Sequence, residues 1–178
     1  MSLVAEGTSG ATAVTVTHLI HEGPAPVVRP APTGVRIVRA EADLASSSAR
    51  MYAAVGAQWS WVDRRAWSAE QWQAWVDRPG FSHWLLFHDG ECAGYAEFIE
   101  PESGSVQIAF FGLLPEFVGR GLGAWWLEYV LDLAWQQSGV ERVTLHTCEL
   151  DHPSALPNYR ARGFVPTHTE VEWRMVHE

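Results

Sequence analysis

Apolar and polar residues alternate in several short segments of the chain, and this period of two predicts β-strands. Strands are expected at 34–40 (GVRIVRA), 104–114 (GSVQIAFFGLL) and 141–150 (ERVTLHTCEL), with one or two more at 164–178. Two apolar runs within 83–100 flank Asp89-Gly90, a dipeptide typical of a two-residue hairpin turn. These segments predict a sheet with antiparallel strands at its centre.

A period close to 3.6 residues indicates helices elsewhere. The clearest helix is expected at 121–138, before Gly139, and its buried face is formed by Leu122, Trp125, Trp126, Tyr129, Val130 and Leu133. Shorter helices are expected at 43–56, after Ser68 and at 152–163. Ser68 is a plausible N-cap, and the spacing of Trp72 and Trp75 places both in the core.

From residue 34 the expected order of elements is β-α-α-β-β-β-α-β-α-β. This order predicts an α/β protein of the α+β type, with a mixed, largely antiparallel central sheet flanked by helices. Before it, residues 11–20 (ATAVTVTHLI) alternate like a strand that either pairs with the domain edge or forms a loose tail, and residues 19–33 are a proline-rich linker. We expect a strand or tail with its linker at 1–33 and one domain at 34–178.

Composition and charge narrow the range of partners. The 178 residues are 47% hydrophobic and 19% charged, which is typical of a globular domain. The net charge is −9 and no basic tract is present, so we expect no nucleic-acid partner, and small cationic substrates such as amines are weakly favoured. All 12 basic residues are arginine, which excludes mechanisms that need a lysine, such as a Schiff base.

The two cysteines, Cys92 and Cys148, form neither a CxxC pair nor a disulfide framework, and this favours a reducing compartment. The sequence contains no recognisable signal peptide or membrane span. We therefore expect a cytoplasmic protein with no membrane partner and no bound metal, and a homodimer stays open.

Residues 114–124 (LPEFVGRGLGA) place three glycines and an arginine between a predicted strand and the long helix. The first N–H groups of a helix lack partners within it, and the helix dipole adds partial positive charge there, so this position suits an anion. Gly119, Gly121 and Gly123 let the backbone approach a pyrophosphate closely, and Arg120 adds a cation. A tight glycine-rich turn without a ligand is the alternative.

One interpretation of this loop is a dinucleotide fingerprint. Gly119-x-Gly121-x-x-Ala124 matches it, and Glu149 ends the next strand, roughly where a ribose-binding acid stands. However, residues 115–118 separate the strand from the first glycine, several strands precede the loop, and little chain follows Glu149. A dinucleotide-dependent oxidoreductase is therefore the weaker alternative.

The segment LLPEFVGRGLGAWWLEY resembles the acyl-CoA pyrophosphate loop of the GCN5-related N-acetyltransferases (GNAT family). That family has a Pro-Glu step, a Gln/Arg-x-x-Gly-x-Gly/Ala loop and then a helix; here the loop is 118–123, and Val118 occupies the position where glutamine or arginine is preferred. DHPSALPNYRARGF resembles the late family segment Asn-x-x-Ala-x-x-x-Tyr-x-x-x-Gly-Phe. Ala155, Tyr159 and Gly163-Phe164 match it, and His152 stands at the asparagine position.

The resemblance covers roughly 34–177 and implies a GNAT-like acyl-CoA N-acyltransferase fold with acetyl-CoA as cofactor. It implies transfer of an acetyl or other short acyl group to a small amine by direct attack in a ternary complex. The cofactor-binding positions that it implies are Leu113, Leu114, Val118, Gly119, Arg120, Gly121, Leu122, Gly123, Ala124, His152 and Asn158. Gly112 is expected at a splay of the preceding strand, beside which the N–H of Leu113 or Leu114 would reach the thioester oxygen.

In this interpretation Tyr159 is the general acid, because a phenol with a pKa of about 10 can protonate a thiolate whose thiol has a pKa of about 8.5. Glu97 is the candidate general base, since a carboxylate among apolar residues of a central strand has a raised pKa. Because Glu97 is two residues from both Tyr95 and Ile99, the three side chains share one face of the strand. The other interpretation is that this face is exposed to solvent. Weaker candidates for the base are Asp151, Glu149 and His146.

Five tryptophans lie between residues 59 and 75, in the part of the chain that covers the acceptor site in the GNAT family. Trp59, Trp61 and Asp63 are candidates to line an acceptor pocket, in which aromatic faces and an acid suit an ammonium group. A non-catalytic acyl-CoA-binding or sensing domain is the main alternative to an enzyme. Val118 departs from the glutamine or arginine that the family prefers, and the sequence offers no obvious general base.

Overall fold

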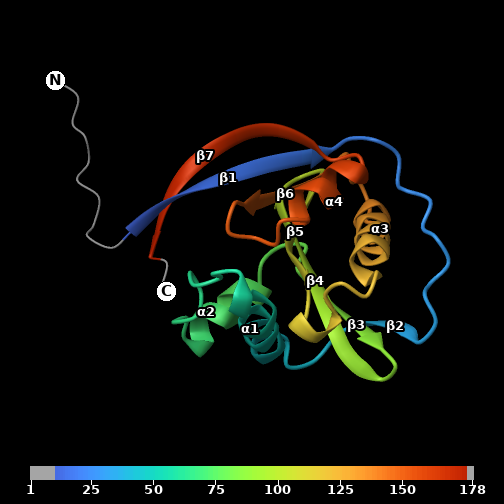
Figure 1. The fold of residues 1–178 in the computed structure, drawn as a ribbon, viewed down its shortest axis with the longest axis horizontal. Helices are drawn as coiled ribbons and strands as arrows, with labels where there is room; N and C mark the ends of the chain where they lie inside the picture. The colour runs from blue at the N-terminus through green and yellow to red at the C-terminus, as the bar shows by residue number, and fades with distance from the viewer. Residues whose placement is uncertain (1–10, 176–178) are drawn as a thin grey trace.

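A mixed sheet with the strand order β2-β3-β4-β5-β6-β1-β7 runs through the computed structural model, which describes residues 11–175 (Figure 1). Neighbouring strands are antiparallel except β5 and β6. The strands are β1 (Ala11–His21), β2 (Val35–Arg39), β3 (Ser82–His88), β4 (Glu91–Glu102), β5 (Ser105–Leu113), β6 (Arg142–Cys148) and β7 (Val165–Met175). The α-helices are α1 (Leu44–Val55), α2 (Ala69–Val76), α3 (Leu122–Trp135) and α4 (Ala155–Ala161). The predicted fold class is confirmed.

Helices cover both faces of the sheet, with α1 and α2 on one side and α3 on the other (Figure 1). Alternate residues of a strand point to opposite faces. On β4, Ala96 and Phe98 therefore belong to the core under α3, whereas Tyr95 and Ile99 pack toward α1 and α2. Glu97 is two residues from each of them and therefore points to the same face, which α1 and α2 cover. Its side chain is fully buried.

The local signals for turns and caps are confirmed. Asp89 and Gly90 join β3 to β4 with φ angles of 50° and 84°, the left-handed pair that a two-residue hairpin turn requires. Ser68 caps α2 by accepting a hydrogen bond from the Gln71 N–H, and Trp72 of that helix is buried as predicted.

Helix α3 begins and ends inside its predicted range, and its buried face is wider than the predicted stripe. Leu127 and Leu131 are buried, whereas Tyr129 and Leu133 are only partly covered. The proline-rich segment runs along the outside of α3 (Figure 1), where the Trp125 Nε1–H donates to the Arg29 carbonyl oxygen at 2.9 Å. None of the helices within residues 11–175 has the length and apolar character that crossing a bilayer requires.

Strand β1 lies inside the sheet, where it pairs with β6 and with the edge strand β7, so of the two expectations for this segment the loose tail is wrong. Val14 and Val16 are fully buried, and Leu19 is 2% exposed. The strand continues to His21, so the linker begins three residues later than the predicted start at residue 19. The predicted division of the chain after residue 33 stays a prediction. Strand β1 precedes that boundary, yet it forms part of the same sheet as the strands that follow it.

Strands β5 and β6 diverge, and this divergence positions the site. Their parallel pairing covers only Ser105–Gln107 on β5, and the two strands separate beyond it. Phe110 pairs with Glu97 and Ile108 with Phe98, which leaves Ala109 as the extra residue of a bulge. We expected the irregularity at Gly112; the structure instead gives that glycine a packing reason, since a Cβ there would overlap the Val55 side chain of α1.

Candidate active site

A cavity of about 680 Å³ opens beside the diverging strands β5 and β6. One part of its wall comes from the glycine loop and α4, and another from α1, the segment after it, and the end of β7. Of the candidate site residues, those lining the cavity are Trp59, Trp61, Asp63, Leu113, Val118, Gly119, Gly121, Gly123, Ala124, His152, Asn158 and Tyr159. The structure therefore brings together most of the residues that the sequence singled out.

The glycine loop forms an open backbone cradle. Gly119 and Gly121 have φ angles of 79° and 78°, and Gly121 is the N-cap of α3. A Cβ on either glycine would meet nothing within 4 Å, so the space beside this backbone is free. An open backbone at the N-terminus of a helix is suited to a pyrophosphate, and the residues present therefore fit the anionic part of a CoA molecule.

Three of the predicted cofactor residues do not line this cavity. The Arg120 guanidinium lies over the Phe117 ring, 5.0 Å from its centroid, and Leu122 is buried in the core under α3. The Leu114 N–H donates to the Ala93 carbonyl oxygen at 2.8 Å and is therefore not free for a ligand. In the antiparallel register that this hydrogen bond fixes, the N–H of Leu113 points away from β4, toward the gap beside β5.

Helix α4 is tied to the cradle by two of the predicted residues. His152 Nδ1 accepts a hydrogen bond from the Ser154 N–H at 3.0 Å, and its ring lies edge-on to Trp59 at a centroid distance of 4.9 Å. Asn158 Nδ2 donates to the carbonyl oxygen of Gly123 at 3.4 Å. The Asn158 contact links α4 to the first turn of α3, whereas the His152 contacts join the segment before α4 to Trp59.

Tyr159 lies on α4, with its ring packed edge-on against Phe111 and Phe164 at the cavity wall. Burial raises the pKa of the Tyr159 hydroxyl well above its usual value, and the nearby negative charge of Asp151 raises this pKa further. The phenol therefore stays protonated at neutral and moderately alkaline pH.

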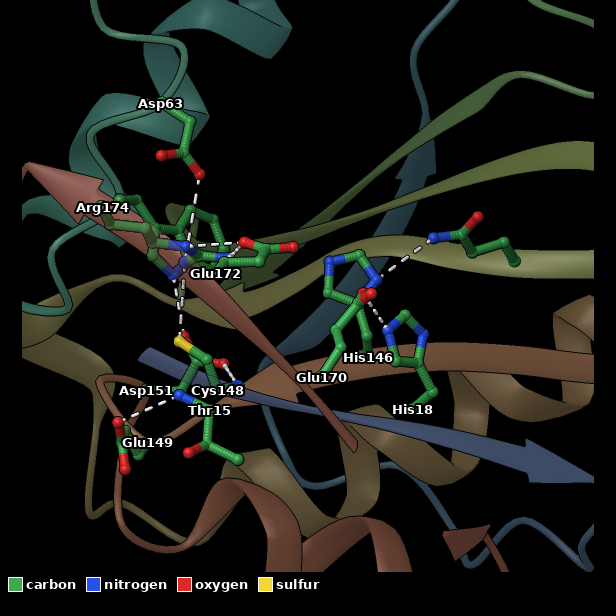
Figure 2. A network of polar contacts seen from close by, with 12 residues as sticks. Thr15, His18, Asp63, His146, Cys148, Glu149, Asp151, Glu170, Glu172 and Arg174 are labelled. Atoms are coloured by element: carbon green, nitrogen blue, oxygen red, sulfur yellow. Dashed lines mark hydrogen bonds and ion pairs between the residues drawn. The ribbon is translucent and has the colours of Figure 1, made fainter. Parts of the chain in front are cut away.

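Asp151 holds a tryptophan in the cavity wall (Figure 2 shows Asp151 beside Cys148). Its Oδ1 accepts from the Trp61 Nε1–H at 3.0 Å. Its Oδ2 accepts from the Thr147 hydroxyl at 2.7 Å and from the Cys148 N–H at 3.0 Å. Because both carboxylate oxygens are occupied, the structure favours a positioning role for Asp151. Glu149, another candidate base, bonds the Thr15 N–H and does not line the cavity.

Three histidines occupy neighbouring positions across β6, β1 and β7, and one of them, His146, lines the cavity. His18 stacks on His168 at a centroid distance of 4.3 Å and lies 5.6 Å from His146. Glu170 contacts His18, with 2.6 Å between Oε1 and Nε2 (Figure 2). His146 is exposed to solvent at the cavity wall, but the surrounding protein atoms partly desolvate its ring and so lower its pKa. The adjacent His18 lowers this pKa further, which favours the neutral imidazole at neutral pH.

Glu97, the predicted general base, lies outside the cavity lining. Its Oε2 accepts from the Trp75 Nε1–H at 2.8 Å, and its Oε1 is 2.7 Å from His83 Nδ1. The other ring nitrogen of His83 is 3.0 Å from the Ser47 hydroxyl. Both carboxylate oxygens are therefore engaged in a fully buried network, and the structure corrects the base assignment: Glu97 positions Trp75, which does line the cavity.

The aromatic half of the cavity contains the predicted acceptor residues and others that the sequence analysis did not single out. Its lining residues are Tyr52, Trp59, Trp61, Asp63, Arg64, Trp75 and Phe110. Asp63 is partly exposed and lies 3.9 Å from Arg174 of β7 (Figure 2). Arg64 was missed because its position next to Asp63 in an irregular segment carries no motif, and only the fold brings it against Trp75 and Phe110.

A family model described as "Acetyltransferase (GNAT) family" matches residues 48–164. The chain belongs to this family, and the predicted family is thereby confirmed. No curated protein gives a significant match.

Solved structures with similar folds carry the same family name. A GCN5-related N-acetyltransferase from Sphaerobacter thermophilus has a TM-score of 0.70 at 17% identity, over 91% of this chain. One from Kribbella flavida has a TM-score of 0.64 at 22% identity over 92%, and a putative GNAT acetyltransferase from Novosphingobium aromaticivorans DSM 12444 has 0.63 at 20% over 94%. The matched regions cover 51%, 59% and 67% of those chains, so this chain spans only half to two thirds of their length.

Proposed function

We propose that this protein is an N-acetyltransferase that transfers an acetyl group from acetyl-CoA to a small amine by direct attack in a ternary complex. The observation that carries the proposal is that one cavity is lined both by the glycine cradle and by the aromatic residues on the opposite side of the diverging strands. Two substrates held in one cavity react as if at a very high local concentration, and this is the main requirement for direct transfer.

The residues that would hold the cofactor are the backbone of 119–124 and the side chain of Asn158, which hydrogen-bonds the same loop. Bound acetyl-CoA would supply the thioester that donates the acetyl group. The N–H of Leu113, which points away from β4, would donate to the thioester oxygen as negative charge develops on it.

Two side chains of the cavity would move protons. Neutral His146 would accept the proton that the attacking amine loses, and Tyr159 would donate a proton to the departing thiolate of the cofactor. The opposite pKa shifts support these roles, because each group is kept in the protonation state that its role needs at neutral pH.

Two measurements test the proposal. In a thermal-shift panel we expect acetyl-CoA and CoA to raise Tm and NAD or NADP to leave it unchanged, because a ligand at about 100 times its Kd adds about 2.7 kcal/mol of stability. Release of free CoA thiol is then followed with a panel of small amines. No shift with CoA would contradict the cradle assignment, and binding without turnover of any amine would favour a non-catalytic acyl-CoA-binding domain.

A further inference from the structure

Arg64 presents a half-buried cation to the aromatic half of the cavity. Its guanidinium carbon lies 3.9 Å from the centroid of the Trp75 ring, 4.5 Å from that of Trp67 and 4.7 Å from that of Phe110. The NH1 nitrogen is buried and has no hydrogen-bond partner among residues 11–175. Aromatic faces attract a cation, but they do not replace the acceptors that its N–H groups lose on leaving water.

The other two arginines that line the cavity have carboxylate partners. Arg174 pairs with Glu172 at 2.7 Å and with Asp63 at 3.9 Å (Figure 2), and Arg162 pairs with Glu128 at 3.3 Å. Within the described part of the chain no carboxylate lies within ion-pair distance of Arg64. Arg64 is thus the lining cation that is left for a ligand.

The surroundings hold this guanidinium in place. The Trp75 ring on which it lies is fixed by the hydrogen bond from its Nε1–H to Glu97. The backbone N–H of Arg64 donates to the Tyr52 hydroxyl at 3.3 Å, which anchors the loop at α1. A cation positioned in this way loses little conformational freedom when an anion binds, so the interaction is favourable for affinity.

We propose that the amine acceptor also carries a carboxylate, and that Arg64 binds this carboxylate in the aromatic half of the cavity. This inference rests on the proposed function and names the substrate class of the same site. A guanidinium presents a planar set of donors that matches a carboxylate. Asp63 is more than half exposed and only 3.9 Å from Arg174, so it is the lining carboxylate left to attract the ammonium group of a zwitterion such as an amino acid.

The first test uses acceptor pairs that differ only in the carboxylate. L-phenylalanine is compared with 2-phenylethylamine, L-leucine with 3-methylbutylamine and glycine with methylamine, and kcat/KM is measured by release of the CoA thiol. Acceptors with apolar side chains are included because aromatic residues line this half of the cavity. In at least one pair we expect the amino acid to be favoured by about 10- to 100-fold, the range of a charge-assisted hydrogen bond. Equal rates within every pair that reacts would overturn the inference while leaving the proposed function intact.

Arg64→Gln and the matched control Arg65→Gln separate the lining arginine from its exposed neighbour, which does not line the cavity. We expect Arg64→Gln to abolish the preference for the carboxylate, measured as the ratio of the two kcat/KM values within each acceptor pair. Arg65→Gln should retain the preference. Arg64→Lys keeps the positive charge without the planar set of donors and should retain part of the carboxylate preference. This variant provides the test if Arg64→Gln fails to fold.

A binding measurement distinguishes failure of this inference from failure of the proposed function. N-acetyl-L-phenylalanine and N-acetyl-2-phenylethylamine are titrated against the protein, with tryptophan fluorescence as the signal, since three tryptophans line the cavity. If the wild type binds the acid more tightly than the neutral compound and Arg64→Gln loses this preference, the carboxylate site is supported. This result stands even if no amine turns over, an outcome in which the proposed function fails. Equal binding of both compounds overturns the site. Weaker acetyl-CoA binding in Arg64→Gln, but not in Arg65→Gln, also overturns it, because the anion would then belong to the cofactor.

Discussion

At the scale of single residues, the cavity keeps an acid and a base ready at the same pH. Loss of hydration disfavours the charged form of any side chain, so it raises the pKa of the buried Tyr159 and lowers that of His146, which is only partly desolvated at the cavity wall. One physical cause therefore keeps the phenol protonated and the imidazole unprotonated. Glu97 is also buried, but its two oxygens already have donors, and for this reason a buried carboxylate in a central strand was a misleading signal for the base.

Tyr159→Phe tests the acid. The change removes the hydroxyl and keeps the ring that packs on Phe111 and Phe164, so we expect unchanged acetyl-CoA affinity. Loss of general-acid assistance should lower kcat by about 10²- to 10⁴-fold. Tyr129→Phe is the control, because Tyr129 belongs to α3, packs beside Trp125 and does not line the cavity. Wild-type kcat in Tyr159→Phe would remove the hydroxyl from the mechanism, and a large loss of acetyl-CoA binding would make its role structural.

His146 gives a prediction about pH. Its pKa is lowered by partial desolvation and by His18, while Glu172 and Asp151 act in the opposite direction and Arg174 adds to the lowering. The base is lost when the imidazole gains a proton, so kcat/KM should fall toward acid with a midpoint below the usual histidine value of about 6.5.

Two variants check this assignment in pH–rate profiles. His146→Gln should lower kcat/KM by about 10²-fold and abolish the acid limb. His18→Gln removes one cause of the lowered pKa, so the limb should move toward higher pH while the maximum rate is retained. An unchanged acid limb in His146→Gln would assign the titration to another group.

At the scale of elements, turns and the periodicity of hydrophobic residues can be predicted from the sequence, whereas β-bulges cannot. The Asp89-Gly90 turn was predictable, and on its own it would place His83 opposite Ala96. A register shift between Leu86 and Phe87 instead places His83 opposite Glu97, which creates the buried network. The bulge at Ala109 was missed for the same reason: it follows from tertiary packing around one extra residue and leaves no local pattern.

The glycine cradle gives the prediction for this scale. Gly121→Asp puts a side chain and a negative charge into the open space beside the N-terminus of α3, so binding of CoA should be lost. Gly139→Asp is a matched control, because Gly139 has a φ angle of 75°, equally open surroundings and no place in the cavity lining. Both variants carry similar backbone strain of about 1 kcal/mol, so their Tm values should fall alike. Isothermal titration with CoA then separates the two, and tight binding by a folded Gly121→Asp protein would refute the assignment of the loop.

At the scale of the whole molecule, the cavity depends on contacts between segments that are distant in the chain. Trp61 is held by Asp151, and Asp63 lies beside Arg174 of β7. The sequence predicted Trp59, Trp61 and Asp63 as lining residues from the family resemblance, but nothing local indicates that β7 forms part of the wall. The position of β7 in turn depends on β1, which pairs with it along almost its whole length.

Leu19→Ala tests whether β1 belongs to the same folding unit as the sheet. Leu19 is 2% exposed and lies in the core under α3, so removing its side chain should lower the free energy of unfolding by about 2–5 kcal/mol in a single cooperative transition. The control is Thr12→Ala on the same strand, where the side chain is exposed and the change should stay within about 0.5 kcal/mol. Urea unfolding followed by circular dichroism measures both. If Leu19→Ala is as stable as the wild type, residues before 34 form a separate segment, as the predicted division of the chain states; if it is destabilised as expected, the sheet, β7 and the Arg174 side of the cavity depend on β1.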